Sequence, residues 1–291
     1  METLCFDRLP VPELARWRRE SAAAPSRHWE KVSADARGAR SLTLWIKPYA
    51  VYLPTCEGLE LSAFYVASNA LHSLVGKSAL NMPLKPLITG FGIGAYGRSG
   101  VVAIPGIGTR FAAAVTGCDA EPDPKWDWRE DRPLSEECTD CRACVSACPN
   151  GALIGDGRLN TDSCLRAQAQ YQSPPMPYAS RERLGSSIWG CEICQQVCPR
   201  NGGQEPVLMP PELEAALTLK RLLQGDVSAL GEWIGTNYAR PARMQARACL
   251  IAANMARRDL LPDIRALLKS QVEPVRDCAA WAIEKLKDGG N

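Results

Sequence analysis

The sequence lacks any long hydrophobic run. No stretch approaches the ~18 apolar residues that a membrane-spanning helix needs. The N-terminal residues, METLCFDRLPVPELARWRRE, are polar and charged, with no apolar segment or cleavage site of the kind that directs secretion. We therefore expect a cytoplasmic protein without membrane contact, in a compartment where thiols stay reduced.

An excess of one charge is also missing, and histidine is scarce. The 34 Lys and Arg against 32 Asp and Glu leave a net charge of +2, which argues against a chain built as a whole to bind polyanions. The two histidines, His28 and His72, stand alone without ligand spacing around them. We expect both to be structural or exposed, so any metal must be held by other side chains.

Cysteine, in contrast, is abundant, and eight of the thirteen cysteines fall into two motifs. The first is C-x2-C-x2-C-x3-C-P, the run of bacterial ferredoxins with two 4Fe–4S clusters, in which the fourth cysteine ligates the other cluster. The second is C-x2-C-x3-C-P, with one further cysteine 27 residues upstream. By the same logic, the last cysteine of the second motif should ligate the cluster of the first motif. The predicted ligands are Cys138, Cys141, Cys144 and Cys198 for one cluster, and Cys148, Cys164, Cys191 and Cys194 for the other.

Zinc is the alternative, because paired C-x2-C motifs also form four-cysteine zinc sites. Two runs that each end in Cys-Pro favour iron–sulfur clusters over zinc. The remaining cysteines are Cys5, Cys56, Cys118, Cys249 and Cys278. Cys249 and Cys278 lie on apolar helix faces, so we expect them in the core. A ligand role for Cys118 is disfavoured.

The order of segments predicts an α+β protein. We expect an N-terminal α/β domain over residues 1–118, with a helical lead-in over 1–40, a strand region over 41–54 broken by Pro48, and a helix over 60–76. An acidic linker (119–137) and the cysteine-rich domain (138–205) follow. A helical domain (206–291) completes the chain, with Pro241, Pro262 and Pro274 where helices begin. Its last two helices resemble a HEAT-type pair.

The cysteine-rich segment resembles epoxyqueuosine reductases, which carry out the last step of queuosine synthesis in tRNA. The resemblance rests on the first motif, on a cysteine in a helix after it, and on residues 188–199, IWGCEICQQVCP. The double-cluster arrangement is also similar to that of reductive dehalogenases. The resemblance implies a corrinoid-binding domain before the clusters and a helical-repeat domain after them, and the segment order here agrees.

Residues 87–110 hold seven glycines in 24 residues. This segment resembles the family's glycine-rich cobalamin loop, which implies cobalamin contacts for seven residues: Gly90, Gly92, Gly94, Tyr96, Gly97, Arg98 and Gly100. The alternative is a plain glycine-rich turn before a buried strand. The family also carries an aspartate, the proton donor, in a segment before the loop. The corresponding residues 81–86, NMPLKP, have no carboxylate, which leaves Tyr96 and Tyr65 as candidate proton donors.

We therefore expect an iron–sulfur redox protein that passes electrons through two 4Fe–4S clusters to a corrinoid for substrate reduction. Its electron donor would be a ferredoxin or flavodoxin. Residues 240–291 contain ten Lys or Arg against six Asp or Glu, and such a surface is compatible with tRNA, although a solvated helix face is the favoured explanation. The alternative function is a non-catalytic, ferredoxin-like module that hands electrons to a protein partner.

Overall fold

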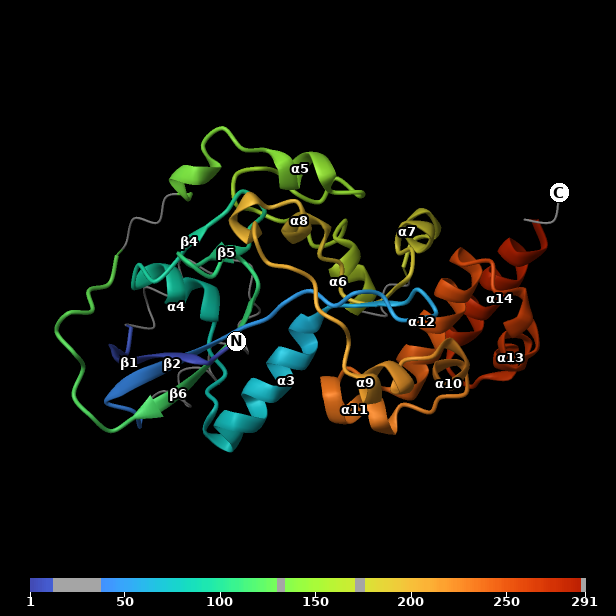
Figure 1. Cartoon of the computed structure of the whole chain (residues 1–291), viewed down its shortest axis with the longest axis horizontal. Coiled ribbons are helices and arrows are strands. Elements are labelled where there is room, and N and C mark those ends of the chain that lie inside the picture. The colour runs from blue at the N-terminus through green and yellow to red at the C-terminus, as the bar shows by residue number, and fades with distance from the viewer. Residues whose placement is uncertain (13–37, 130–133, 171–175, 289–291) are drawn as a thin grey trace.

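The N-terminal part of the chain is a three-stranded antiparallel sheet with a helix on each face. The computed structural model describes residues 1–12, 38–129, 134–170 and 176–288. Strands β1 (Leu4–Pro10), β2 (Ser41–Pro48) and β6 (Phe111–Cys118) lie in the order β1-β2-β6 (Figure 1). The prediction of a helical lead-in over residues 1–40 is wrong for Leu4–Pro10, which form strand β1. Residues 13–37 lie outside the described part of the chain. The predicted break at Pro48 is confirmed, because β2 ends there.

Successive side chains along each strand point to opposite faces of the sheet, so each face packs against a different helix. Leu42, Leu44 and Ile46 point to one face and pack with Leu87 and Ile88 of α4 (Leu84–Gly90). The opposite face carries small side chains, among them Ala112 and Ala114 of β6. The predicted helix lies there as α3 (Ala63–Val75), which begins at the N-cap Ser62 and buries Ala67 and Leu71. The exposed His72 lies on this helix, whereas His28 is outside the described residues.

The cysteine-rich segment is built from short elements joined by turns. In chain order they are η2 (Glu136–Cys138), α5 (Ala143–Ala147), α6 (Leu165–Gln170), α7 (Tyr178–Arg183), β7 (Ser187–Trp189), α8 (Ile193–Gln196) and η3 (Pro199–Asn201). Strand β7 pairs in parallel with β3 (Glu60–Leu61), so this segment is hydrogen-bonded to the residues that lead into α3. The remaining N-terminal elements are η1 (Gly76–Ser78) and a hairpin of β4 (Ala95–Tyr96) and β5 (Val102–Ala103).

The C-terminal part is helical, as predicted. It contains α9 (Pro211–Ala216), α10 (Leu219–Leu223), α11 (Ser228–Ile234), α12 (Pro241–Asn254), η4 (Arg258–Leu260), α13 (Leu261–Ala266), η5 (Leu267–Lys269) and α14 (Glu273–Asp288). Pro241, Pro262 and Pro274 each stand in a first turn, which confirms them as helix starts. The HEAT-type pairing and the domain boundaries stay predictions.

The largest hydrophobic core crosses the predicted boundary at residue 205. It joins Tyr65 of α3 and Trp189 of β7 to the helices from α9 onward, and it includes Cys249 and Cys278, the two cysteines predicted to be buried. The acidic segment after β6 also packs onto the fold, because Trp128 meets Phe91 edge-to-face at 5.1 Å. The α+β prediction is confirmed as a mixture of helix and strand. Within the described residues, no helix is both long and apolar enough to span a membrane.

Candidate metal centre

The eight motif cysteines stand at the ends of short elements, where backbone turns aim side chains inward. Cys138 ends η2, Cys144 lies in α5, Cys148 caps the C-terminus of α5 and Cys194 lies in α8. Cys164 directly precedes α6 instead of lying within the predicted helix. All eight are free thiols of intermediate exposure. They therefore remain available as ligands.

The fold brings Cys198 to the first motif. Burial raises the pKa of the Cys144 thiol, and the neighbouring Cys198, Cys138 and Cys141 raise it further. The pKa of Cys198 is likewise raised, by burial and by Cys138 and Cys141, although a backbone N–H and the guanidinium of Arg200 oppose the shift. The last cysteine of the second motif thus interacts electrostatically with the first three cysteines of the first motif. The crossed ligation that the sequence predicts stays a prediction.

The other four cysteines form a second group. Burial raises the pKa of Cys191, and Cys164 and Cys148 add to the shift. Burial also raises the pKa of Cys194 to about 12, with contributions from Cys191, Cys164, Cys144 and Cys148. The contribution of Cys144, from the first group, places the groups next to each other. A metal that binds these groups must displace their protons, because the thiolate is the ligand.

The glycine loop holds the first cysteine group in place through Arg98. The guanidinium of Arg98 donates to the carbonyl oxygens of Cys138 and Thr139, both at 2.6 Å, and of Gly155 at 2.7 Å. These three hydrogen bonds all go to the backbone of the cysteine-rich segment. The resemblance implied a cobalamin contact for Arg98, and that contact stays a prediction. In the structure, Arg98 joins the β4–β5 hairpin to the cysteine-rich segment.

Protein atoms explain the glycines of this loop. A Cβ atom at Gly90 would lie 2.5 Å from the ring of Trp128, and one at Gly94 would lie 2.6 Å from the carbonyl oxygen of Ala103. At Gly100, which has a φ of +71°, the obstacle is the carbonyl oxygen of Gly157 at 2.7 Å. Glycine is therefore required for close packing of chain against chain, as in the alternative reading of a structural turn. Gly92 and Gly94 of the same loop also line a pocket of about 320 Å³, and the predicted cobalamin contacts stay predictions.

A cavity of about 470 Å³ separates the cysteine-rich segment from the N-terminal sheet and α4. One wall carries Cys148, Cys164, Cys191 and Cys194, and the other carries mainly apolar side chains such as Phe111 of β6 and Val102 of β5. None of the seven residues predicted to contact cobalamin is among those that line it, although Ser99 and Val101 of the same segment are. The second cysteine group thus faces the large cavity in the described structure.

Two cationic side chains, Lys85 and Arg166, line this cavity, and neither was predicted from the sequence. Lys85 projects into it from α4 and donates from Nζ to the carbonyl oxygen of Gly100 at 2.8 Å. Its side chain is accessible because it faces the open cavity. Surrounding protein nevertheless lowers its pKa by desolvation, and Arg166 lowers it further, against the opposing effect of Cys194 and Cys164. A single lysine or arginine carries no motif, so only the fold reveals the pair.

A buried carboxylate lies between the cysteines of the second motif. Glu192 is 7% exposed, and its Oε1 accepts hydrogen bonds from the hydroxyls of Tyr49 at 2.8 Å and Ser62 at 2.6 Å. Burial raises the pKa of Tyr49 well above its usual value, and Glu192 adds to the shift. The guanidinium of Arg166 lies 4.5 Å from the ring centre of Phe64 beside this network. These bonds join the start of α3 and the end of β2 to the cysteine motif.

The two tyrosines predicted as proton donors do not line the cavity. Tyr65 is 2% exposed and packs against Trp189 and Tyr238 at ring-centre distances of 5.7 and 4.8 Å, and burial raises its pKa. Tyr96 lies in β4 opposite Val102, where its carbonyl oxygen accepts a hydrogen bond from Ser135. The sequence placed both near the loop but gave no information about which way each side chain points.

Comparison with known proteins agrees with this geometry. Residues 137–201 match the 4Fe–4S double cluster binding domain family. Epoxyqueuosine reductase from Staphylococcus aureus is 28% identical over 275 residues, 88% of this chain and 68% of that protein. The Lactococcus garvieae enzyme is 34% identical over 68% of this chain and 56% of its own length. The chain belongs to the epoxyqueuosine reductase-like family. It spans only about half to two thirds of these relatives.

Solved epoxyqueuosine reductases share the fold. The structure from Streptococcus thermophilus superposes with a TM-score of 0.71 at 20% identity, covering 100% of this chain and 87% of that one. An epoxyqueuosine reductase crystallised with an epoxyqueuosine-modified tRNA-Tyr stem loop gives a TM-score of 0.73 at 22% identity, covering 98% and 86%. The sheet, the cysteine-rich segment and the helices of this epoxyqueuosine reductase-like chain are thus arranged as in the family.

Proposed function

We propose that this chain is an iron–sulfur oxidoreductase of the epoxyqueuosine reductase type. The observation that carries the proposal is the cavity of about 470 Å³ with Cys148, Cys164, Cys191 and Cys194 in its wall. A cluster held by these four cysteines would lie against the space where a cofactor and substrate bind. Electrons would then reach that space without a further carrier.

Eight cysteines in two adjoining groups fit two 4Fe–4S clusters. Cys138, Cys141, Cys144 and Cys198 would hold the first cluster, and the four cysteines at the cavity would hold the second. When bound, the clusters supply one-electron carriers. Cys144 contributes to the electrostatics of Cys194 across the two groups, so the two clusters would lie close enough to exchange electrons. A ferredoxin or flavodoxin is the proposed donor.

The cavity, instead of the glycine loop, is the place where we propose a corrinoid binds. Its walls are largely apolar, and Lys85 and Arg166 offer two cations beside the cysteines. When bound, the corrinoid supplies the reduced metal centre that acts on the substrate. The chain's own residues would exclude water from one side through Phe111 and Val102 and orient the cofactor against the cysteine wall.

Cobalamin uptake tests this placement. Protein reconstituted with iron, sulfide and hydroxocobalamin should carry corrinoid absorption through gel filtration. Ala113→Trp should weaken uptake strongly, because Ala113 lines the cavity and an indole there would occupy part of the space that the corrinoid needs. Leu74→Trp is the matched control, since Leu74 is 62% exposed on α3. Loss of the corrinoid from the unmodified protein, or equal uptake by the Ala113→Trp variant, contradicts the placement.

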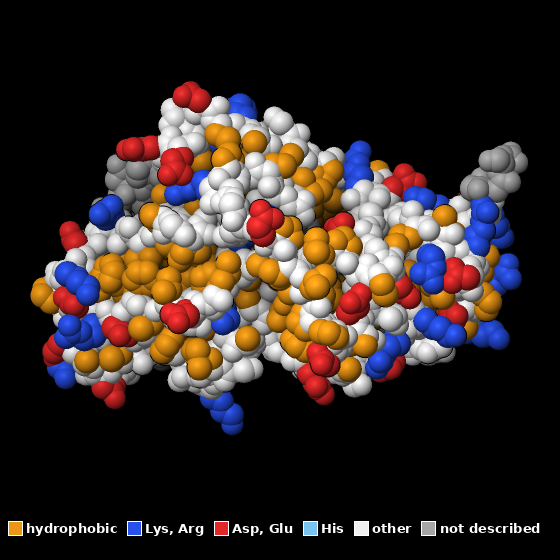
Figure 2. All heavy atoms as spheres, in the orientation of Figure 1, with side chains coloured by type: hydrophobic (Ala, Val, Ile, Leu, Met, Phe, Trp, Pro, Cys, Tyr) orange, Lys and Arg blue, Asp and Glu red, His pale blue; other side chains and the backbone are white. Residues whose placement is uncertain are grey.

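The substrate proposed for this chain is epoxyqueuosine in a tRNA anticodon stem loop. A solved relative was crystallised with such a stem loop. Residues 240–291 carry the excess of basic side chains, and Lys and Arg gather at the α13–α14 end of the molecule (Figure 2). Gel-shift titration with the modified stem loop tests the binding. Affinity that is unchanged between low and high salt would contradict it, because phosphate contacts are salt-dependent.

One observation supports a different function. Among the described residues that line the cavity there is no Asp or Glu, and residues 81–86 likewise contain no carboxylate. A non-catalytic module would need no proton donor and would pass electrons to a protein partner. The two functions separate in an assay of epoxyqueuosine reduction. Lacking a positioned acid, the chain should react about 10²–10⁴-fold more slowly than a family member that has one, and Asn81→Asp should recover part of the rate.

A further inference from the structure

A buried amide side chain lies shortly after the last cysteine of the second motif. Asn201 ends η3, the short helix that directly follows Cys198, and 5% of its surface is exposed. It is not among the described residues that line the cavity at the cysteines. A polar side chain that is buried in protein needs hydrogen-bond partners there, so the groups that Asn201 contacts define its role.

The amide of Asn201 makes three hydrogen bonds, which join the two sides of the cavity. Its Nδ2 donates to the carbonyl oxygen of Gln195 at 2.7 Å and to Oγ1 of Thr109 at 2.8 Å. Its Oδ1 accepts from the backbone N–H of Thr109 at 2.8 Å. Thr109 lies on the sheet side, just before β6, whereas Gln195 lies in α8 on the cysteine side, and both line the cavity. The contact needs an acceptor and two donors in one side chain, which is the chemistry of an amide.

The chain before β6 packs tightly against η3. Gly108 has a φ of +80°, and a Cβ atom there would lie 2.6 Å from the carbonyl oxygen of Arg200 and would clash with Oδ1 of Asn201. Glycine is required at this position, because it has no Cβ atom and adopts a positive φ readily. The backbone of residues 108–109 is thus in direct contact with η3 and holds Asn201 in place relative to the sheet.

The backbone that Asn201 holds on the other side is the turn from Cys194 to Cys198. The carbonyl oxygen of Gln195, inside this turn, accepts from Asn201 and also from the N–H of Cys198 at 3.3 Å. The N–H of Asn201 in turn donates to the carbonyl oxygen of Cys198 at 3.0 Å. In the predicted assignment, Cys194 ligates the second cluster and Cys198 the first. On that assignment, this turn carries one ligand of each cluster.

We propose that Asn201 is a positioning residue for electron transfer between the two clusters. This role rests on the proposed function, because it needs both clusters. Asn201 fixes the turn from Cys194 to Cys198 against Thr109, so that the two ligand Sγ atoms, and with them the clusters, keep one separation. Hydrogen bonds behind metal ligands set the orientation of those ligands, and their loss typically weakens metal binding about 10–100-fold. Removal of Asn201 should loosen both clusters, because the turn serves both.

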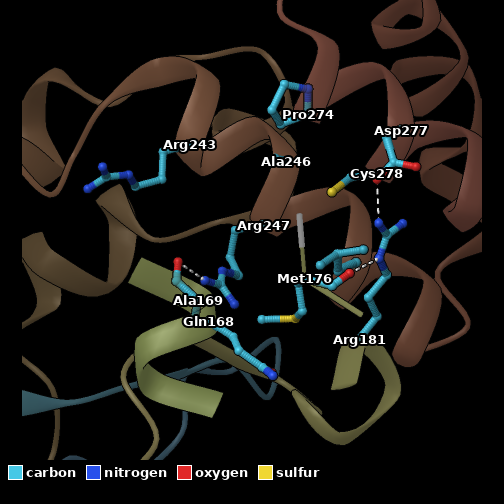
Figure 3. Close-up of a pocket in the computed structure, with 11 residues that line it drawn as sticks. Gln168, Ala169, Met176, Arg181, Arg243, Ala246, Arg247, Pro274, Asp277 and Cys278 are labelled. Atoms are coloured by element: carbon cyan, nitrogen blue, oxygen red, sulfur yellow. Dashed lines mark hydrogen bonds and ion pairs between the residues drawn. The ribbon is translucent and has the colours of Figure 1, made fainter. Parts of the chain in front are cut away.

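The contacts between the cysteine-rich segment and the C-terminal helices offer a matched control. Figure 3 shows Arg181 of α7 paired with Asp277 of α14, and Arg247 of α12 donating to the backbone of α6 at 2.6 Å. Nearby, Nδ2 of Asn254 donates to the carbonyl oxygen of Arg181 at 2.8 Å. Asn254 therefore has the same chemistry as Asn201 and also fastens this segment, but it does not hold a turn between two cysteine ligands.

Iron release from the anaerobically reconstituted protein to a chelator tests the proposal, together with electron paramagnetic resonance of the fully reduced protein. The unmodified protein should show the splitting of two interacting clusters. Asn201→Ala should release iron from both clusters at least about tenfold faster and should alter that splitting. Asn254→Ala should change neither, although it also removes buried hydrogen bonds.

A milder pair of variants keeps the test valid if Asn201→Ala does not fold. Thr109→Val removes the Oγ1 acceptor but keeps the shape of the side chain, so it should speed release from both clusters. Thr109→Ser keeps the hydroxyl and should release iron at nearly the unmodified rate. Equal release from the two Thr109 variants overturns the proposal, as does an effect of Asn201→Ala on one cluster alone or an equal effect of Asn254→Ala. An unmodified protein that holds fewer than two clusters overturns the proposed function as well.

Discussion

Lys85→Met should lower the reduction potential of the second cluster and leave the first unchanged. The cation interacts electrostatically with Cys194 and Cys164, and a positive charge stabilises the more negative, reduced cluster. For a charge on the order of 7 Å from the cluster and an effective dielectric constant of about 20–40, the Coulomb energy would be roughly 1.2–2.4 kcal/mol. For a one-electron couple this corresponds to a potential about 50–100 mV more negative. Water in the cavity raises the effective dielectric constant, so we expect a shift near the smaller value of about 50 mV.

The assay is a redox titration followed by electron paramagnetic resonance, which resolves the two clusters by their potentials. Lys85→Arg keeps the charge and should stay within about 20 mV of the unmodified protein, a shift well below the Coulomb estimate. Lys77→Met removes an exposed lysine in η1, directly after α3, and should change neither potential. An unchanged potential in Lys85→Met, or an equal shift of both clusters, would refute the placement of this side chain beside the second cluster alone.

Three further outcomes follow from the site. Cys198→Ala should reduce the iron content of the cluster held by the first motif, and damage confined to the other cluster would show the partition to be wrong. Tyr49→Phe removes a donor to buried Glu192 and should lower the free energy of unfolding by about 1–3 kcal/mol, measured by denaturant titration. In the control, Tyr178→Phe should change it by less than about 0.5 kcal/mol, because Tyr178 is 62% exposed. A chelator should increase hydrogen exchange first within residues 138–199, because metal binding is coupled to folding there; uniform loss of protection across the chain would count against this.

The sequence predicted a double-cluster segment, which the family match over residues 137–201 supports, because the information is local. The spacing between cysteines, with a proline after each run, specifies how the backbone wraps, and the assignment of each cysteine to one cluster stays a prediction. The proline-started helices were predictable for the same reason, since Pro at a first turn is a local preference. The helical domain therefore needed no tertiary information to be recognised.

The rest depends on contacts between distant residues. The strand at Leu4–Pro10 has no strong pattern of its own and is fixed by pairing with β2. At Gly90, Gly94 and Gly100 a side chain would meet Trp128, the carbonyl oxygen of Ala103 and that of Gly157, and only the fold reveals these neighbours. Glu192, Lys85 and Arg247 each lack a motif, and their roles arise only from the burial and partners that the fold gives them.

The central claim is that eight cysteines hold two clusters and that the second cluster faces the cavity. Anomalous scattering at the iron edge from crystals of anaerobically reconstituted protein tests it most directly. The account predicts two iron sites per chain, one among Cys138, Cys141, Cys144 and Cys198 and the other in the cavity wall among Cys148, Cys164, Cys191 and Cys194. A single iron site, zinc in place of iron, or a second cluster closed off from the cavity would contradict it.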